Sequence, residues 1–362
     1  MIILRIVIDL DGVICTLKKE GESYSEVAPL PGAIEKLKQL KKDGHYIIIH
    51  TARHMLTTEN NMGLINKKIG KITLDWLEKY QIPYDEIYFG KPYGKVYIDD
   101  SAIVFKSWSQ IDPKYFDEEK INIVIPMAGE GSRFKKAGFE IPKPLIKIQN
   151  KKMFKWAVES FANIKQNYQL IFIVLKKHVD EYKIDEEIKI EYPNSKVIVL
   201  NKITRGQAET VLKAKKYIDN FNKLVIFNSD TYFESRDIEN ILNNDKIDGA
   251  LACFKDNSNS ERYSFVKMDK QNNLLDIAEK KRISDFASNG FYYFKHGKDY
   301  VDSIEEIILN DERIEREFYV IPTYKKLLNR GFRLKIFLVD KNWIMGTPEE
   351  LDAFNRNFKH EK

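Results

Sequence analysis

The feature that most constrains the fold is an alternation of short apolar runs with helical stretches, which occurs twice along the chain. Continuous apolar strands separated by helices are typical of a parallel sheet covered on both faces. The first series ends in a polar, irregular stretch at residues 106–120, and the alternation restarts at "INIVIPMAG", residues 121–129. A chain of 362 residues also exceeds one typical core.

The sequence therefore predicts two tandem α/β domains, each a mainly parallel sheet flanked by helices. We place the first domain at residues 1–106, the linker at 107–120 and the second domain at 121–362. In the first series, the predicted strands are 3–10, 45–51, 86–90 and 95–100, and the predicted helices are 32–44 and 73–82. In the second, the predicted strands are 121–129, 169–175, 195–200, 223–230 and 249–254, and the predicted helices are 153–164 and 206–218.

Composition narrows the class of partner. The formal charge of +5 arises from 59 basic and 54 acidic residues spread along the chain, which suits anionic substrates. No basic face or aromatic-basic motif stands out, so we expect no nucleic acid partner. Cys15 and Cys253 are too few for a disulfide framework or a zinc site. No signal-peptide pattern or apolar run of about 20 residues occurs, which predicts a cytoplasmic protein with no membrane partner.

Two carboxylates follow the first predicted strand in "DLDGV", as Asp9 and Asp11. On a loop after a strand, one such carboxylate can attack phosphorus while the other protonates the leaving oxygen. Taken alone, a strand that ends in Asp-x-Asp is equally compatible with a structural role or with a generic metal site.

Further polar groups follow the other predicted strands of the first domain. Thr51 could hold a phosphate oxygen, Lys91 could neutralise charge, and Asp99 and Asp100 offer hard oxygen ligands suited to Mg²⁺. Ligand sites in open parallel sheets lie at the carboxyl ends of the strands. We therefore expect all of these groups to meet at one edge of the sheet.

This set, in this order, resembles the haloacid dehalogenase superfamily of phosphatases over roughly residues 1–105. The resemblance implies a Rossmannoid domain that hydrolyses a phosphate monoester through an aspartyl-phosphate. Neither the gap between the first and second motifs nor that between the second and third is long enough for a cap domain, and the irregular segment 16–32 is only a flap. The sequence therefore says little about the substrate. The implied roles are Asp9 as nucleophile, Asp11 as general acid and base, Thr51 and Lys91 as phosphate ligands, and Asp99 or Asp100 as a magnesium ligand beside Asp9 and Asp11.

In the second domain, the loop "PMAGEGSRF" presents Gly129, Gly131, Ser132 and Arg133 after a predicted strand. Small residues let backbone N–H groups approach phosphate oxygens, and an arginine adds a charge-assisted contact. The loop is not a P-loop, because no Gly-Lys-Ser/Thr follows. Ten residues downstream of the arginine, "PKPL" offers Lys143 to the same phosphates.

A solitary carboxylate, Asp230, ends the predicted strand 223–230 and can hold Mg²⁺. Together with the loop and Lys143, it resembles the sugar-phosphate nucleotidyltransferase family across most of residues 121–362. The resemblance implies a Rossmann-like domain in which Arg133 and Lys143 are catalytic and the phosphates lie against Gly129, Gly131 and Ser132. It implies further that the base contacts Gly206 and Gln207, and that the sugar site contains Glu279, Lys280, Asn289 and Gly290.

One position departs from that family. Many of its members place a second metal-binding aspartate just after the closing tryptophan, whereas this chain has Ile344 and Met345 after Trp343. Asp340 is the nearest carboxylate, and a single-metal site is equally open.

The leading interpretation is a bifunctional enzyme for precursors of a surface polysaccharide such as a capsule. It would transfer a nucleotidyl group from a nucleoside triphosphate, with CTP favoured over dTTP or UTP, to a sugar or polyol phosphate, and would also hydrolyse a phosphate monoester. The alternatives are one catalytic domain with an auxiliary phosphatase-like domain, or a non-catalytic scaffold. The oligomeric state stays open and is compatible with a homo-oligomer.

Overall fold

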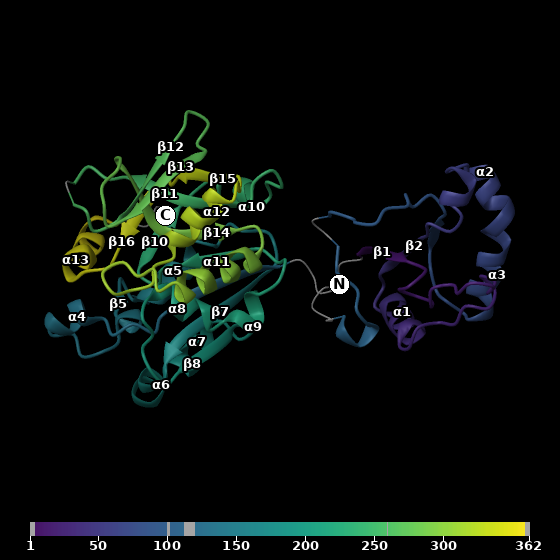
Figure 1. The fold of residues 1–362 in the computed structure, drawn as a ribbon. Coiled ribbons are helices and arrows are strands. Elements are labelled where there is room, and N and C mark those ends of the chain that lie inside the picture. Colours follow the sequence, from purple (N-terminus) through teal and green to yellow (C-terminus); the bar gives the residue numbers. More distant parts are fainter. Residues whose placement is uncertain (1–3, 100–101, 112–119, 259, 359–362) are drawn as a thin grey trace. The chain divides into compact units, whose positions relative to one another are not determined.

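The computed structural model describes residues 4–99, 102–111, 120–258 and 260–358 (Figure 1). The chain divides into two compact units, Met1–Glu118 and Glu119–Lys362. Within the described residues, no helix has both the length and the apolar character needed to cross a bilayer.

The first unit is built on a parallel sheet of three strands in the order β1-β2-β3. Its register sets Asp9 opposite His50, and His50 opposite Tyr88, so the carboxyl ends of the three strands are level. Apolar side chains of the strands pack with Leu37 and Trp76 in one core. In chain order the elements are β1 (Arg5–Asp9), α1 (Ala33–Lys42), β2 (Tyr46–His50), η1 (Leu56–Thr58), α2 (Met62–Ile65), the π-helical turn η2 (Asn66–Gly70), α3 (Lys71–Lys79), β3 (Glu86–Tyr88) and η3 (Trp108–Gln110).

The strand predicted at residues 95–100 is not present in the described part of this segment, residues 95–99. Val96 is 76% exposed and Ile98 is 99% exposed, so neither side chain enters the core. Strand propensity reflects packing on a half-buried sheet surface more than an intrinsic preference of the backbone. Without such burial, the apolar residues of this segment do not form a strand.

The chain beyond residue 106 contributes to the first unit. Trp108 is 7% exposed, packs in the core of that unit and donates a hydrogen bond from Nε1 to the carbonyl oxygen of Val13 at 2.7 Å. The linker expected from residue 107 therefore begins with residues that belong to the first unit, because the indole buries a large apolar surface.

We predict that the two units are separable, because each has its own hydrophobic core. A fragment of residues 1–112 and a fragment of residues 119–362 should each give a cooperative thermal melt. Ending the first fragment at residue 104 removes Trp108 and should lower its melting temperature. If neither fragment melts cooperatively while the full chain does, the two cores depend on each other.

The second unit is built on a sheet of nine strands that is mixed rather than mainly parallel. Strands β4, β7, β8 and β9 pair in parallel, whereas β12, β13 and β14 pair antiparallel, and β14 joins the two parts by pairing with β9. The expectation of a mainly parallel sheet was wrong for this unit, because consecutive strands between residues 264 and 294 fold back as neighbours. Such direct returns form antiparallel pairs, whereas parallel pairs need crossover helices.

The elements of the second unit up to β9 are β4 (Ile121–Pro126), α4 (Ser132–Lys136), η5 (Lys143–Leu145), β5 (Lys147–Ile148), β6 (Lys151–Lys152), α5 (Met153–Glu159), β7 (Tyr168–Leu175), α6 (Lys176–Tyr182), α7 (Ile184–Glu191), β8 (Lys196–Leu200), α8 (Gln207–Leu212), α9 (Lys215–Ile218) and β9 (Leu224–Phe227). The remaining elements are β10 (Thr231–Glu234), α10 (Ile238–Leu242), β11 (Gly249–Lys255), β12 (Ser264–Met268), β13 (Leu274–Glu279), β14 (Phe286–Phe294), α11 (Gly297–Leu309), α12 (Ile321–Asn329), β15 (Leu334–Leu338), β16 (Lys341–Ile344) and α13 (Pro348–Asn357).

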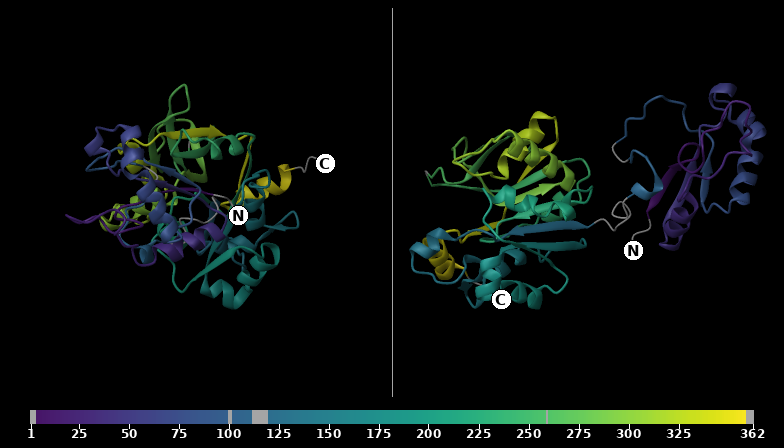
Figure 2. Two further views of the ribbon diagram at one scale, coloured as in Figure 1. Left: turned by 90° about the vertical axis from the view of Figure 1, so that its right-hand side faces the viewer. Right: turned by 60° about the horizontal axis from the view of Figure 1, so that its bottom comes forward.

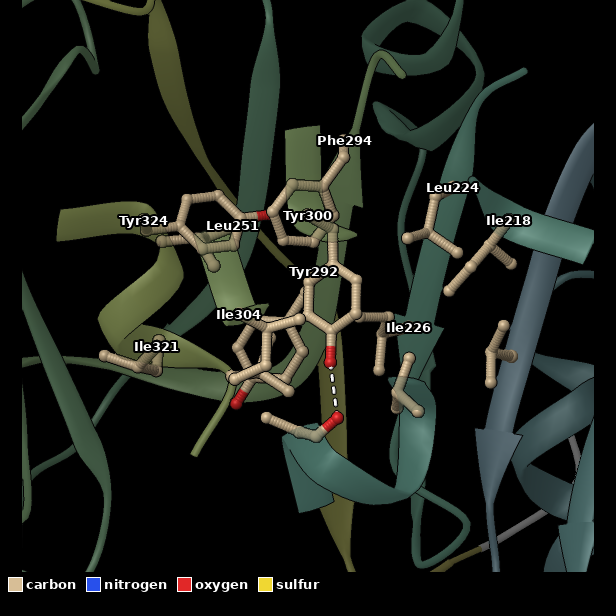
Figure 3. Packing of buried hydrophobic residues seen from close by; sticks show 14 of the residues in the cluster. Ile218, Leu224, Ile226, Leu251, Tyr292, Phe294, Tyr300, Ile304, Ile321 and Tyr324 are labelled. Carbon is tan, nitrogen blue, oxygen red and sulfur yellow. Dashed lines mark hydrogen bonds between the residues drawn. The ribbon is translucent and has the colours of Figure 1, made fainter. Parts of the chain in front are cut away.

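Helices cover both faces of this sheet (Figure 2). Alternate side chains of β4 enter different cores: Ile123 and Ile125 pack with α5, α7 and α10, whereas Val124 packs with α8, α11 and α12. On the latter face, the Tyr300 hydroxyl donates to the carbonyl oxygen of Ala208 at 2.7 Å, which satisfies a polar group inside the core (Figure 3). Strands β4 and β9 thus lie between the two cores, and the loops after these strands carry predicted site residues.

Candidate functional site

A cavity of about 690 Å³ opens in the second unit at the carboxyl ends of β4 and β9. Its walls come from the loop after β4, the turn η5, the start of α8, the β9–β10 turn and the segment after β16. The predicted residues that line it are Gly129, Gly131, Ser132, Arg133, Lys143, Gly206, Gln207 and Asp230.

The cavity brings together a lysine and an aspartate 87 positions apart in the sequence. Lys143 Nζ forms an ion pair with Asp230 Oδ2, and both side chains are about one-fifth exposed. Gly131 allows this lysine to lie close to the loop: its φ is +64°, and a Cβ there would be 3.2 Å from the Cβ of Lys143. Only glycine adopts such backbone without strain, so the loop can pass directly over the lysine.

The wall predicted to contact the base depends on a second glycine. Gly206 has a φ of +138°, and a Cβ there would lie 2.5 Å from the backbone nitrogen and oxygen of Phe318. This close approach lets Phe318 N donate to the Arg205 carbonyl at 2.8 Å and Ala208 N donate to the Phe318 carbonyl at 3.0 Å. The start of α8 is thereby fixed, with Gln207 on the cavity wall.

Asn228 connects the predicted base and sugar residues, and the sequence reasoning missed it. Gln207 Nε2 donates to Asn228 Oδ1 at 2.6 Å. Gly290 has a φ of +91°, and a Cβ there would be 2.3 Å from Asn228 Nδ2. Next to it, Asn289 is 2% exposed, and its Nδ2 has no hydrogen-bond partner. A buried amide donor without a partner is uncommon, and neither Asn289 nor Gly290 is on the cavity wall.

Glu279 and Lys280 are not on the cavity wall. The Glu279 carboxylate, at the end of β13, accepts a hydrogen bond from Ser264 Oγ, and burial raises its pKa above the ordinary value. Lys280 forms an ion pair with Glu315 and lies 5.1 Å from the Tyr319 ring centroid. The two residues of the predicted pair therefore have different partners: Glu279 contacts Ser264, and Lys280 contacts Glu315.

Asp230 is the candidate Mg²⁺ ligand on the cavity wall. A Cβ on Gly346 would be 3.3 Å from Asp230 Oδ2 and 3.2 Å from Glu350 Oε2. Glu350 is also ion-paired with Arg262 at 2.5 Å and is not on the wall of this cavity, so Asp230 is the candidate ligand here. Carboxylate oxygens are preferred ligands of Mg²⁺. The alternative second ligand, Asp340, instead forms an ion pair with Arg236 at 2.8 Å and is not on the cavity wall.

In the first unit, three predicted residues meet at the carboxyl ends of the strands. Lys91 Nζ forms an ion pair with Asp9 Oδ2. The backbone connects the same loops, because Lys91 N donates to the Thr51 carbonyl at 3.2 Å and Thr51 N donates to the Tyr88 carbonyl at 2.9 Å. Thr51 Oγ1 accepts a hydrogen bond from Arg53 N at 3.2 Å, and the residue is fully buried.

Asp11 lies in the same loop as Asp9 but has a different partner. Its carboxylate accepts hydrogen bonds from Arg53 Nη2 at 2.8 Å and from Arg53 Nε at 2.9 Å. The Arg53 side chain is fully buried. The sequence contained this residue within "HTARH", but nothing in a single sequence marked it as a partner of Asp11.

A complete magnesium site is not assembled in the described part of the first unit. Asp99 lies in a segment without strand structure, and Asp100 lies outside the described residues. Among the described residues, no three carboxylate, imidazole or thiolate groups gather as metal ligands. Asp9 and Asp11 are paired with Lys91 and Arg53, so we derive no catalytic step through a metal in this unit.

Two arginines on the wall of the second unit's cavity were also missed, Arg205 and Arg316. Arg316 follows Glu315 in a tight turn in which both residues have positive φ, 47° and 72°. Such turns usually contain asparagine and glycine, so the Glu-Arg pair carries no recognisable turn signal.

Comparisons with known proteins concern the second unit most clearly. The family model described as "Nucleotidyl transferase" matches residues 123–351, which lie inside that unit. The Bifunctional protein GlmU of Methanocaldococcus jannaschii is 30% identical over 200 residues, which are 54% of this chain and 45% of that protein. The D-glycero-alpha-D-manno-heptose 1-phosphate guanylyltransferase of Campylobacter jejuni is 27% identical over 240 residues, 64% of this chain and 97% of that protein. The chain spans about half the length of the GlmU proteins that it matches.

A solved structure is similar as well. The nucleoside-diphosphate-sugar pyrophosphorylase of Vibrio cholerae RC9 is 30% identical, with a TM-score of 0.57. The match covers 65% of this chain and 99% of the Vibrio chain.

Proposed function

The chain belongs to the nucleotidyl transferase family, and from this membership we propose that its second unit transfers a nucleotidyl group from a nucleoside triphosphate to a sugar or polyol phosphate. The observation that carries the proposal is the cavity in which Arg133, Lys143 and Asp230 gather. These two cations and this carboxylate suit a polyphosphate with a bound divalent ion.

In the proposed reaction, a phosphate oxygen of the acceptor attacks the α-phosphorus of the triphosphate in line. A new phosphorus–oxygen bond forms, the bond between the α- and β-phosphates breaks, and pyrophosphate leaves with the electron pair. Mg²⁺ held by Asp230 would supply charge neutralisation for the phosphates. Lys143 and Arg133 stabilise the charge that builds on the leaving pyrophosphate, and the loop at Gly129–Gly131 positions it.

The proposed reaction needs one particular nucleotide base and one particular acceptor phosphate. We favour CTP, while the Campylobacter relative is named as a guanylyltransferase of a heptose 1-phosphate, so GTP belongs in the test. The full chain should be incubated with CTP, GTP, UTP, ATP or dTTP and a panel of sugar and polyol phosphates, and pyrophosphate release measured. Release that depends on one nucleotide and one acceptor supports the proposal. No release with any pair, from folded protein with Mg²⁺, contradicts it.

Glu279 is expected to contact acceptor hydroxyls as a carboxylate, and burial raises its pKa. The acceptor KM should therefore rise as the pH falls from 7.5, beginning above the range in which an ordinary glutamate titrates. A raised carboxyl pKa means that the folded state binds the proton more tightly, so this group's contribution to stability falls as pH rises from its unfolded to its folded pKa. Glu279→Gln should flatten the pH dependence of the acceptor KM and raise the melting temperature at pH 8 more than at pH 5.

A Glu279→Gln variant with an unchanged acceptor KM and an unchanged pH profile would contradict this role. Asp276→Asn serves as the matched control, because Asp276 lies on the same strand β13, is ion-paired with Lys325 and is not on the cavity wall.

A second activity is favoured by the contacts in the first unit. We propose that Asp9, Thr51 and Lys91 hydrolyse a phosphate monoester through an aspartyl-phosphate, in a haloacid dehalogenase-like domain. Asp9 is the nucleophile, Lys91 neutralises it and the incoming phosphate, and the Thr51 hydroxyl donates to a phosphate oxygen. Support comes from the ion pair between Asp9 and Lys91 and from the backbone hydrogen bond that joins Lys91 to Thr51.

Two activities in one chain would supply a pathway with both an activated sugar and a dephosphorylated intermediate, as in precursor synthesis for a surface polysaccharide. The alternative is an auxiliary first unit beside a catalytic second one. Phosphate release from 4-nitrophenyl phosphate by the isolated residues 1–112 distinguishes the two.

A further inference from the structure

The first unit contains a fully buried arginine that no step of the proposed reaction uses. Arg53 lies two residues after Thr51, and its side chain has no exposed surface. Burying an unpaired guanidinium is costly, so a buried arginine is retained where its hydrogen bonds are satisfied. The hydrogen-bond partners of Arg53 therefore indicate which group this arginine holds in place.

Arg53 makes both of its strongest contacts to one carboxylate. Nη2 donates to Asp11 Oδ1 at 2.8 Å, and Nε donates to Asp11 Oδ2 at 2.9 Å. This two-point geometry fixes the plane of the carboxylate as well as its distance. Asp11 itself keeps 21% of its side chain exposed, so it faces solvent on the side away from the arginine.

The guanidinium is itself held from the other sides. Nη1 donates to Thr73 Oγ1 at 3.2 Å, and the Tyr24 ring centroid lies 4.5 Å from Cζ. Thr73 is on α3, directly after the π-helical turn at Asn66–Gly70. Wide turns of this kind interrupt helices at functional sites more often than elsewhere. The segments that contain Tyr24, Thr73 and Asp11 thus all contact Arg53, and the contact with Asp11 is the one made through two hydrogen bonds.

The two oxygens of Asp11 are not equally occupied. Oδ1 accepts from Nη2, from Nε at 3.1 Å and from Cys15 Sγ at 3.4 Å, whereas Oδ2 accepts only from Nε among the bonds of the described residues. We propose that Arg53 is a positioning residue that presents Asp11 Oδ2 to the leaving oxygen of the phosphate monoester. This inference rests on the phosphatase activity proposed above.

The step is a general acid–base one. Asp9 forms a bond to phosphorus, the ester bond from phosphorus to the leaving oxygen breaks, and the proton on Asp11 goes to that oxygen to give an alcohol. Water then attacks the phosphorus of the aspartyl-phosphate and gives a proton to Asp11. The bond from phosphorus to the Asp9 oxygen breaks, which releases inorganic phosphate and restores the Asp9 carboxylate. A poor leaving group such as an alkoxide needs this proton, whereas 4-nitrophenolate leaves without it.

The leaving group therefore provides the test. In the full-length protein, Arg53→Lys keeps the charge but not the two-point contact. It should lower kcat for glycerol phosphate by roughly 10- to 100-fold, within the range that one general acid contributes, and kcat for 4-nitrophenyl phosphate by less than about threefold. Asp11→Asn should show the same imbalance. The double variant should be no worse than Asp11→Asn alone, since both changes remove one function.

Two further variants keep the result interpretable. Arg5→Lys is the same substitution at an exposed arginine of β1 and should change neither rate. Thr73→Val removes the bond to Nη1 and should give a smaller imbalance of the same kind, even if Arg53→Lys fails to fold. Equal loss with both esters in Arg53→Lys, or in Thr73→Val, overturns the positioning role while leaving the phosphatase in place. A folded wild-type protein that hydrolyses neither ester overturns the phosphatase and this role together.

Discussion

Asp9→Asn is expected to lower the rate of phosphate release by the first unit by ~10⁴-fold or more, which is the scale of losing a covalent nucleophile. An amide cannot form the bond to phosphorus, and its neutral side chain also loses the ion pair with Lys91. The measurement is hydrolysis of 4-nitrophenyl phosphate, followed by acid quench to trap the phosphoenzyme. Wild type should carry trapped phosphate, and the variant none.

Nucleotidyl transfer by the same preparation is the internal control. Asp9 and Asp230 belong to different units with separate cores, so transfer should stay within about twofold of wild type. Asp43→Asn is a matched control, because Asp43 follows α1 and is paired with Gln39 rather than with Lys91. Retained phosphate release in Asp9→Asn would remove the nucleophile from its proposed role.

Lys143→Ala should lower nucleotidyl transfer by at least ~100-fold, the scale of losing one well-placed charge stabiliser worth about 2.7 kcal/mol. Lys143 is ion-paired with Asp230 inside the cavity, and the absence of a side chain at Gly131 lets the lysine lie close to the loop. A lysine that acts on the developing charge lowers kcat more than it raises the KM for the nucleotide. Steady-state kinetics with varied triphosphate separates the two.

Lys147→Ala is the matched control for this prediction. Lys147 is exposed in β5, four residues further along, and is not on the cavity wall. It should leave kcat and the nucleotide KM unchanged. If Lys143→Ala loses less than about threefold and high salt mimics the loss, the lysine is a solvated surface charge. An equal loss of phosphate release in Lys143→Ala would instead indicate misfolding.

The sequence predicted those parts of the sites that lie at strand ends. Asp9, Thr51 and Lys91 each follow an apolar run, and parallel strands bring their carboxyl ends to one edge, so their meeting followed from the pattern. The same reasoning placed Asp230 after β9. Its pairing with Lys143 depends on how η5 folds back, which only the motif resemblance suggested.

Contacts between distant side chains were beyond a single sequence. Arg53 and Asp11 are 42 positions apart, and Gln207 and Asn228 are 21 apart, with no periodicity that connects either pair. Glu279 and Lys280 are neighbours in sequence but face different partners, because the chain turns between them with a φ of +50° at the lysine. The local sequence pattern predicts whether a segment is a helix or a strand, whereas such side-chain pairs depend on tertiary packing.

Strand β1 has a consequence for handling the first unit. Among the described residues it pairs only with β2, and Val7 in its middle is 60% exposed. An unpaired strand edge with apolar side chains is a template on which another chain can add a strand, and proteins usually protect such edges with charge, proline or a covering segment. The isolated residues 1–112 would expose that edge to other molecules, so their self-association should grow with protein concentration during purification. Val7→Lys is the substitution that would suppress it.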